Sequence, residues 1–162
     1  MKCLVIVDMQ ESFEAANCDR TARNIIKQIF RFKQRNEPIV VLEYEFNSRT
    51  RSDILRAIGN YSLATTQTKS QDDGSIEVMN GLNQLGINID SVSSIFLTGV
   101  NFGACVKSTA MGLQNFIAPE SVFIKKESCN QPDYWNSHSR YSNHTTDKTT
   151  DLLLSQGFQT TK

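Results

Sequence analysis

Apolar residues of this 162-residue chain form short unbroken runs that alternate with longer segments of helical periodicity. Unbroken apolar runs are typical of strands that are covered on both faces in a parallel sheet. On this basis we expect strands at residues 3–7, 39–44, 64–68, 92–97 and 121–125. The strand that begins at Cys3 is expected to place this cysteine in the core.

The segments between these runs have the spacing of amphipathic helices. Ile25, Ile26, Ile29 and Phe30 recur at intervals that place them on one helical stripe, and Gly86 is suited to end a helix. We expect helices at residues 19–35, 52–58, 75–85, 104–115 and 146–155. Residues 130–145 are polar and rich in turn formers, so we expect a loop there.

The alternation of strands and helices predicts the fold class. Such a pattern implies parallel strands joined by right-handed crossovers, with helices on both faces of the sheet. We therefore predict an α/β fold, a three-layer α/β/α arrangement around a mostly parallel open sheet of Rossmann-like topology. The sequence has no internal repeat or linker, so residues 1–162 are expected to form a single domain.

Composition excludes several classes of partner. The 17 basic and 17 acidic residues balance, so we expect neither nucleic acid nor an anionic membrane surface as a partner. No apolar run approaches the roughly 20 residues needed to span a bilayer, and the chain enters a core strand with no signal peptide before it. The four cysteines, Cys3, Cys18, Cys105 and Cys129, have no disulfide or metal spacing. These features predict a reduced, cytoplasmic protein.

Cys105 is the first candidate for chemistry. It follows the strand that ends near Thr98 and Gly99, and it precedes a segment that is expected to be helical. Unpaired N–H groups and the positive dipole end of a helix favour a thiolate, so we expect a depressed thiol pKa and a nucleophilic cysteine. The alternative from position alone is a buried, inert cysteine.

Asp8 and Lys69 lie at comparable positions, each directly after an expected strand. The carboxyl ends of parallel strands share one edge of a sheet, where ligands bind, so these side chains and Cys105 can converge on one cleft. Taken singly, Asp8 can equally be a turn carboxylate and Lys69 a solvated surface lysine.

Several motifs carry a resemblance to a known superfamily. They are the segment from Val5 to Gln10 with Phe13, then Lys69, then Gly99-Val100 followed by Cys105-Val106 and Thr109-Ala110. In order and approximate spacing the chain resembles the isochorismatase-like cysteine hydrolases, which include nicotinamidases and N-carbamoylsarcosine amidases. The similarity covers residues 1 to about 125 and implies the isochorismatase-like form of the α/β fold.

The resemblance implies roles for individual residues. Asp8, Lys69 and Cys105 would form a catalytic triad in which Cys105 attacks a carbonyl carbon and forms a thioester. A cis peptide would join Val100 to Asn101, and the backbone N–H groups of Asn101 and Cys105 would form an oxyanion hole. Phe13, Val100 and Phe102 would contact the substrate.

The sequence departs from the nicotinamidases at their metal site. Those enzymes have an Asp-x-His motif after the second strand and a further histidine downstream, where this chain has Glu43 and Glu45. Two carboxylates without imidazole make a poor zinc site. His138 and His144 lie in the polar segment near the end of the chain and are expected to be surface residues. We therefore expect no metal and no cofactor.

These features together predict a metal-independent cysteine amidohydrolase that cleaves a C–N bond of a small amide or ureido compound. The resemblance also implies a homo-oligomer, either a dimer or a tetramer. Two alternatives are an isochorismatase-type hydrolase, which needs no thiol and is disfavoured by Cys105, and a catalytically idle relative that binds a small metabolite. A third alternative is a flavodoxin-like module that binds a flavin. It is disfavoured because no Gly-rich or Ser/Thr-rich phosphate-binding loop follows Asp8.

Overall fold

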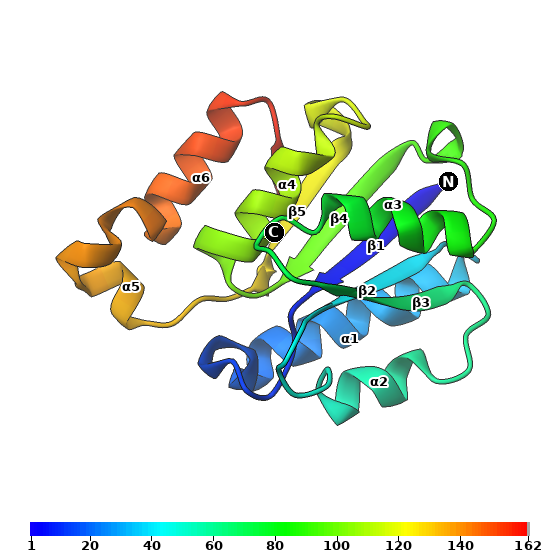
Figure 1. Cartoon of the computed structure of the whole chain (residues 1–162), viewed down its shortest axis with the longest axis horizontal. Coiled ribbons are helices and arrows are strands. Elements are labelled where there is room, and N and C mark those ends of the chain that lie inside the picture. Colours follow the sequence, from blue (N-terminus) through cyan, green and yellow to red (C-terminus); the bar gives the residue numbers. More distant parts are fainter. Residues whose placement is uncertain (162) are drawn as a thin grey trace.

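The computed structural model, described for residues 1–161 apart from the side chains of residues 139 and 141, is built around a parallel β-sheet (Figure 1). Six strands in its described part run in the order β3-β2-β1-β4-β5-β6, and every pairing is parallel. The strands are β1 (Lys2–Val7), β2 (Ile39–Tyr44), β3 (Ala64–Lys69), β4 (Ser94–Gly99), β5 (Val122–Cys129) and β6 (Gln159–Thr161). The parallel sheet confirms the predicted class.

Helices cover both faces of this sheet, which completes the predicted three layers (Figure 1). The α-helices are α1 (Asp19–Gln34), α2 (Ser52–Ile58), α3 (Ser75–Gln84), α4 (Lys107–Leu113), α5 (Tyr134–Ser137) and α6 (Thr146–Ser155). Shorter 3-10 turns are η1 (Glu14–Asn17), η2 (Ile89–Ser91), η4 (Pro119–Ser121) and η5 (Ser139–His144), and η3 (Phe102–Val106) is a π-helical turn.

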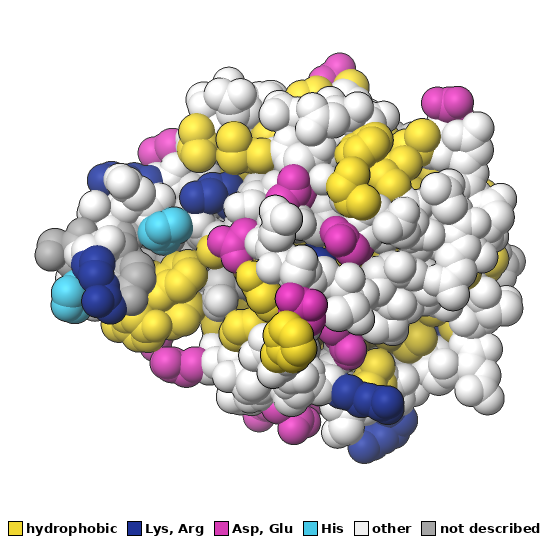
Figure 2. Space-filling model, viewed as in Figure 1, with side chains coloured by type: hydrophobic (Ala, Val, Ile, Leu, Met, Phe, Trp, Pro, Cys, Tyr) yellow, Lys and Arg dark blue, Asp and Glu magenta, His cyan; other side chains and the backbone are white. Residues whose placement is uncertain are grey.

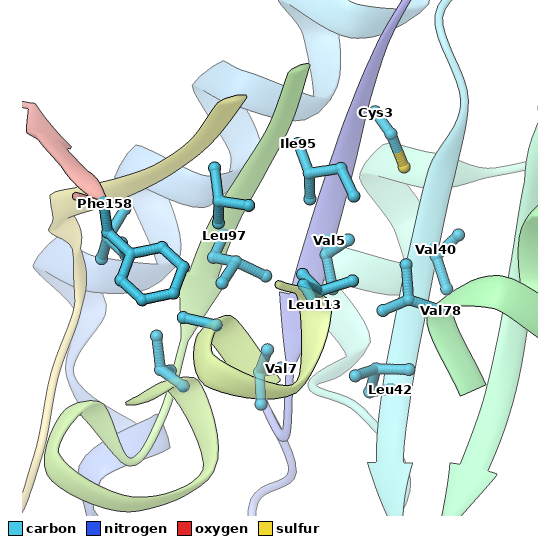
Figure 3. Packing of buried hydrophobic residues seen from close by; sticks show 14 of the residues in the cluster. Cys3, Val5, Val7, Val40, Leu42, Val78, Ile95, Leu97, Leu113 and Phe158 are labelled. Carbon is cyan, nitrogen blue, oxygen red and sulfur yellow. The ribbon is translucent and has the colours of Figure 1, made fainter. Parts of the chain in front are cut away.

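The two faces of the sheet bury two separate apolar clusters. Val5 and Val7 point toward α3, α4 and α6, whereas Leu4 and Ile6 point toward α1 and α2. Figure 3 shows the first cluster, in which Leu97 from β4 lies beside Val5 and Val7. Each fully buried side chain of this size contributes roughly 1.5–3 kcal/mol, so the alternation along β1 holds both helical layers to the sheet.

Some sequence predictions differ from the structure near the C-terminus. Residues 130–145, expected to be a loop, contain α5 and η5, and β6 was not predicted. Strand β6 has only three polar residues, and its pairing with β5 rather than its own pattern makes it a strand. The helical stripe of α1 is narrower than expected, because Phe30 is 52% exposed while Ile25 and Ile29 are buried.

The three candidate catalytic residues lie at the ends of three strands, along one edge of the sheet. Asp8 directly follows β1, Lys69 is the last residue of β3, and the turn that carries Cys105 follows β4. Gly99 has a φ of +114°, and a Cβ there would lie 2.7 Å from the Val7 nitrogen. Because glycine has no side chain, the end of β4 can pack closely against β1. Val100 N–H donates to Val7 O at 2.9 Å. The turn after β4 is thereby fixed beside Asp8.

Candidate active site

Asp8 begins the site at the end of the central strand. Its backbone adopts a left-handed conformation with a φ of +50°, and its N–H donates to Leu42 O at 3.0 Å. These constraints turn the chain out of β1 while the carboxylate stays inside the protein, with no exposed surface. A buried carboxylate is costly unless a cation compensates it.

Lys69 supplies that cation. Its Nζ lies 2.9 Å from Asp8 Oδ2, and the two side chains are 0% and 1% exposed. The ammonium also donates to Gln71 O at 2.9 Å and lies 4.3 Å from the centre of the Tyr44 ring. Sequence reasoning left a solvated surface lysine open for this position, and burial with three partners excludes it.

Cys105 lies in the π-helical turn η3, just ahead of α4. Only 4% of its surface is exposed. Its thiol interacts with the Asp8 carboxylate, and its Sγ lies 3.5 Å from Asp72 Oδ1. The structure therefore brings together Asp8, Lys69 and Cys105, and it adds Asp72 as a second carboxylate.

The electrostatics of the thiol differ from the expectation. Burial and the nearby Asp8 charge raise the pKa of Cys105, and the opposing effect of Lys69 is smaller. The prediction of a depressed thiol pKa is therefore wrong for the resting site, because it rested on the helix terminus and Lys69 and left out the burial of the thiol and the charge of Asp8. Burial also raises the pKa of Asp8, against the pull of Lys69. At rest the proton lies on sulfur, with an acceptor carboxylate beside it.

The turn between β4 and Cys105 contains a cis peptide between Val100 and Asn101. Most N–H groups around it have acceptors: Phe102 donates to Asn130 O at 2.9 Å and Gly103 to Gln131 Oε1 at 3.1 Å. Asn101 N–H has no acceptor among the described residues. This donor remains available at the cavity beside the thiol.

That cavity has a volume of about 310 Å³. It is lined by Phe13, Tyr44, Asn47, Asp72, Asn101, Ala104, Cys105 and Trp135. Phe13 lies where the sequence analysis placed it, but two other expected substrate contacts do not. Val100 is fully buried in the cluster under α1, and Phe102 is buried and lines a different cavity with Cys129 and Gln131. The Val100 and Phe102 side chains therefore pack in the interior beneath the turn that carries Cys105 and do not face the cavity.

Sequence reasoning missed Asp72, Trp135 and His144. Trp135 lines the cavity from α5, and its ring centre lies 5.4 Å from that of His144. His144, expected at the surface, is half-buried, and its Nδ1 lies 2.8 Å from Gly103 O. Since a carbonyl can only accept, Nδ1 carries the proton. Asp72 could have been found from its place three residues after Lys69, whereas nothing in the sequence indicated which way residues 130–145 fold.

One of the two residues that replace the nicotinamidase metal motif, Glu43, has another structural role. Glu43 Oε1 accepts a hydrogen bond from Thr50 N–H at 2.7 Å, which fixes the loop after β2. The described residues contain no group of three or more His, Cys, Asp or Glu side chains placed to hold a metal ion. The site therefore does not fit the metal that the nicotinamidase motif implies.

Comparisons with known proteins support the fold. No protein-family model matches the sequence, and no curated protein matches it. Among solved structures, nicotinamidase SaPncA from Staphylococcus aureus has a TM-score of 0.72 at 16% identity, over 99% of this chain and 98% of that one. N-carbamoylsarcosine amidase from Thermoplasma acidophilum has a TM-score of 0.69 at 14% identity, over 100% and 96%.

A third similar structure carries a different activity in its name. MAR1 ribonuclease from Caenorhabditis elegans has a TM-score of 0.76 at 13% identity, over 98% of this chain and 74% of that one. At these identities the likeness establishes the isochorismatase-like fold, and the chemistry has to be argued from the site itself.

Proposed function

We propose that this protein is a cysteine hydrolase that cleaves a C–N bond of a small amide or ureido compound through a thioester on Cys105. The observation that carries the proposal is the buried Lys69–Asp8 ion pair beside the Cys105 thiol. An inert core cysteine needs no such neighbours, and burying two charges is costly where it serves only stability. The net charge of zero and the small cavity favour a small-molecule substrate over nucleic acid.

In the first half of the proposed reaction, Asp8 removes the thiol proton as sulfur attacks the carbonyl carbon. Lys69 keeps the Asp8 carboxylate in place and offsets the negative charge that remains in the buried site. The Asn101 and Cys105 N–H groups stabilise the oxyanion that forms. The C–N bond then breaks, and protonated Asp8 gives its proton to the departing nitrogen.

In the second half, water attacks the thioester. Asp8 accepts the proton of this water, the C–S bond breaks, and the thiol regains a proton, which returns the site to its resting form. The acid and the amine or ammonia are the two products. Each step uses side chains and backbone groups of the chain, and the proposed reaction has no metal and no cofactor.

Activity screening tests the proposal directly. Wild-type protein and the Cys105→Ala variant are assayed on nicotinamide, carbamoylated amines, ureido compounds and isochorismate. We expect hydrolysis of at least one C–N substrate, with a loss of about 1,000-fold or more in the variant. Hydrolysis of isochorismate alone, unchanged in the variant, would instead favour the vinyl-ether reaction.

We also propose a homo-oligomeric assembly in a reducing, cytoplasmic setting. Four cysteines of the described residues are free, which suits such a setting. Phe46, the chain neighbour of the cavity residue Asn47, is 98% exposed, and Ile76 is 55% exposed on α3. A second copy of the chain would cover these side chains. In the described part of the chain, no helix is long and apolar enough to cross a membrane. Light scattering after size-exclusion chromatography would give the assembly size, and a monomer at all concentrations would contradict the proposal.

A further inference from the structure

The cavity beside Cys105 has an unbalanced charge. Of the described residues that line this cavity, only Asp72 has a charged side chain. Asp72 Oδ1 lies 3.5 Å from Cys105 Sγ, so part of any bound substrate must lie close to this carboxylate. The charge of Asp8 behind the sulfur is already compensated by Lys69.

A second group in the lining is also an acceptor. Asn101 Oδ1 is buried and has no hydrogen-bond partner among the described residues. This oxygen is covered in the free protein, so a bound ligand meets it only when the Asn101 side chain turns. Asp72 therefore favours a ligand that brings N–H donors and positive charge, and it disfavours an anion.

The remaining walls suit the same kind of ligand. Phe13 and Trp135 line the cavity, and aromatic faces attract cations. Tyr44 already holds the Lys69 ammonium 4.3 Å from its ring centre, and Phe13 packs edge-on against Tyr44 at 6.5 Å. On the face shown in Figure 2, acidic side chains gather near the middle, and Lys and Arg side chains lie mainly toward the edges.

We propose that the site selects small amides that carry a cationic amine, and that Asp72 is the specificity-determining residue. This inference rests on the proposed hydrolase function and adds the substrate class. The ammonium group would lie beside Asp72, against the aromatic wall, while the amide carbonyl faces Cys105 and the free Asn101 N–H.

Three amides that differ in one terminal group test this selectivity. β-Alaninamide, butanamide and succinamate end in an ammonium, a methyl and a carboxylate group on the same amide chain. Binding is measured in the Cys105→Ala variant, which removes turnover, by calorimetry and by the fluorescence of Trp135. This residue is the single tryptophan of the chain, so its emission reports on the cavity.

We expect β-alaninamide to bind about tenfold more tightly than butanamide, and succinamate to bind most weakly. Asp72→Asn should reduce the preference to about threefold or less. Glu11→Gln removes an exposed carboxylate that does not line the cavity, and it should leave the preference unchanged. Because Asp72 is exposed, added salt should also weaken the preference.

Several results would overturn the inference: equal affinities for the three amides, no binding of β-alaninamide up to solubility, or a preference that survives Asp72→Asn. Wild-type turnover of the same amides separates this failure from failure of the proposed function. Hydrolysis without charge preference would overturn the selectivity alone. A clear preference in binding, with no amide hydrolysed by the wild-type protein, would overturn the hydrolase function and leave the cation site standing.

Discussion

Lys69 Nζ lies 2.9 Å from Asp8 Oδ2, in a pair whose side chains are 0% and 1% exposed. Lys69 is the last residue of β3, and Asp8 directly follows β1. These two strands are separated in the sheet by β2. The ion pair therefore reaches across the end of β2 at the carboxyl edge of the sheet. It holds Asp8, the base of the proposed reaction, against the turn that carries Cys105.

Removing Lys69 should show how far the site depends on this pair. In Lys69→Met the Asp8 charge stays buried without a partner, so we expect a loss of about 3–5 kcal/mol in the free energy of unfolding. Loss of Lys69 raises the folded-state pKa of Asp8 further, so the penalty is absent below the unfolded-state pKa of about 3.9, grows as pH rises above that value, and levels off above the folded-state pKa.

Denaturant unfolding at several pH values measures this effect. The double variant Asp8→Asn with Lys69→Met removes both charges, and it should recover most of the lost stability. A Lys69→Met variant as stable as the wild type at neutral pH would show that the pair is not buried as described.

The cysteines should react with iodoacetamide in an order set by their pKa values. A hydrogen bond with Thr21 lowers the pKa of Cys18. Burial raises the pKa of Cys3 and of Cys129 to about 12, and it also raises the pKa of Cys105. At neutral pH we expect Cys18 to be labelled first, as read by mass spectrometry of peptides.

The Asp8→Asn variant tests the electrostatic cause in a Cys18→Ser background. Because the Asp8 charge raises the pKa of Cys105, its removal should move the alkylation midpoint of Cys105 to lower pH while turnover is lost. A midpoint of the unaltered Cys105 below about 8.5 would contradict the raised pKa and restore the original expectation.

Activity should not depend on added metal. Glu43 accepts a hydrogen bond from Thr50 N–H, and among the described residues no three His, Cys, Asp or Glu side chains are placed to hold a metal ion. Turnover should be unchanged after dialysis against a chelator. Loss of turnover that zinc or manganese restores would contradict this prediction.

His144 should act as a positioning residue for the nucleophile turn. His144→Phe keeps a ring beside Trp135 but removes the hydrogen bond to Gly103 O, so we expect about 1 kcal/mol less stability. Misplacement of Cys105 should lower kcat about tenfold with a smaller change in KM. His138→Phe, at an exposed histidine of the same segment, is the control and should change kcat less than twofold.

Much of the fold followed from local pattern. The buried runs of β1, β2 and β4 are continuous apolar segments, and the helical segments between them have clear periodicity. Strand β6 could not be predicted, because three polar residues form a strand only through pairing with β5. Residues 134–144 likewise fold into short helices whose sequence has the composition of a loop.

The site was predictable where its residues follow strands, and less so elsewhere. Asp8, Lys69 and Cys105 come together because parallel strands end at one edge, and Phe13 lines the cavity as expected. Val100 and Phe102 were misplaced because the sequence gives no direction for side chains in an irregular turn. The direction of the Cys105 pKa shift could not be predicted for a related reason, since it depends on the burial of the thiol and on the nearby Asp8 charge.

The most direct test of the proposed mechanism is the reaction with p-nitrophenyl acetate, a substrate that acylates thiols faster than the thioester is hydrolysed. Rapid mixing should give a burst of about one equivalent of nitrophenolate per chain, and the acetyl group should map to the peptide that contains Cys105. The burst should disappear in Cys105→Ala and persist in Cys18→Ser. A burst that survives Cys105→Ala, or an acetyl group found on Cys18 alone, would contradict a thioester on Cys105.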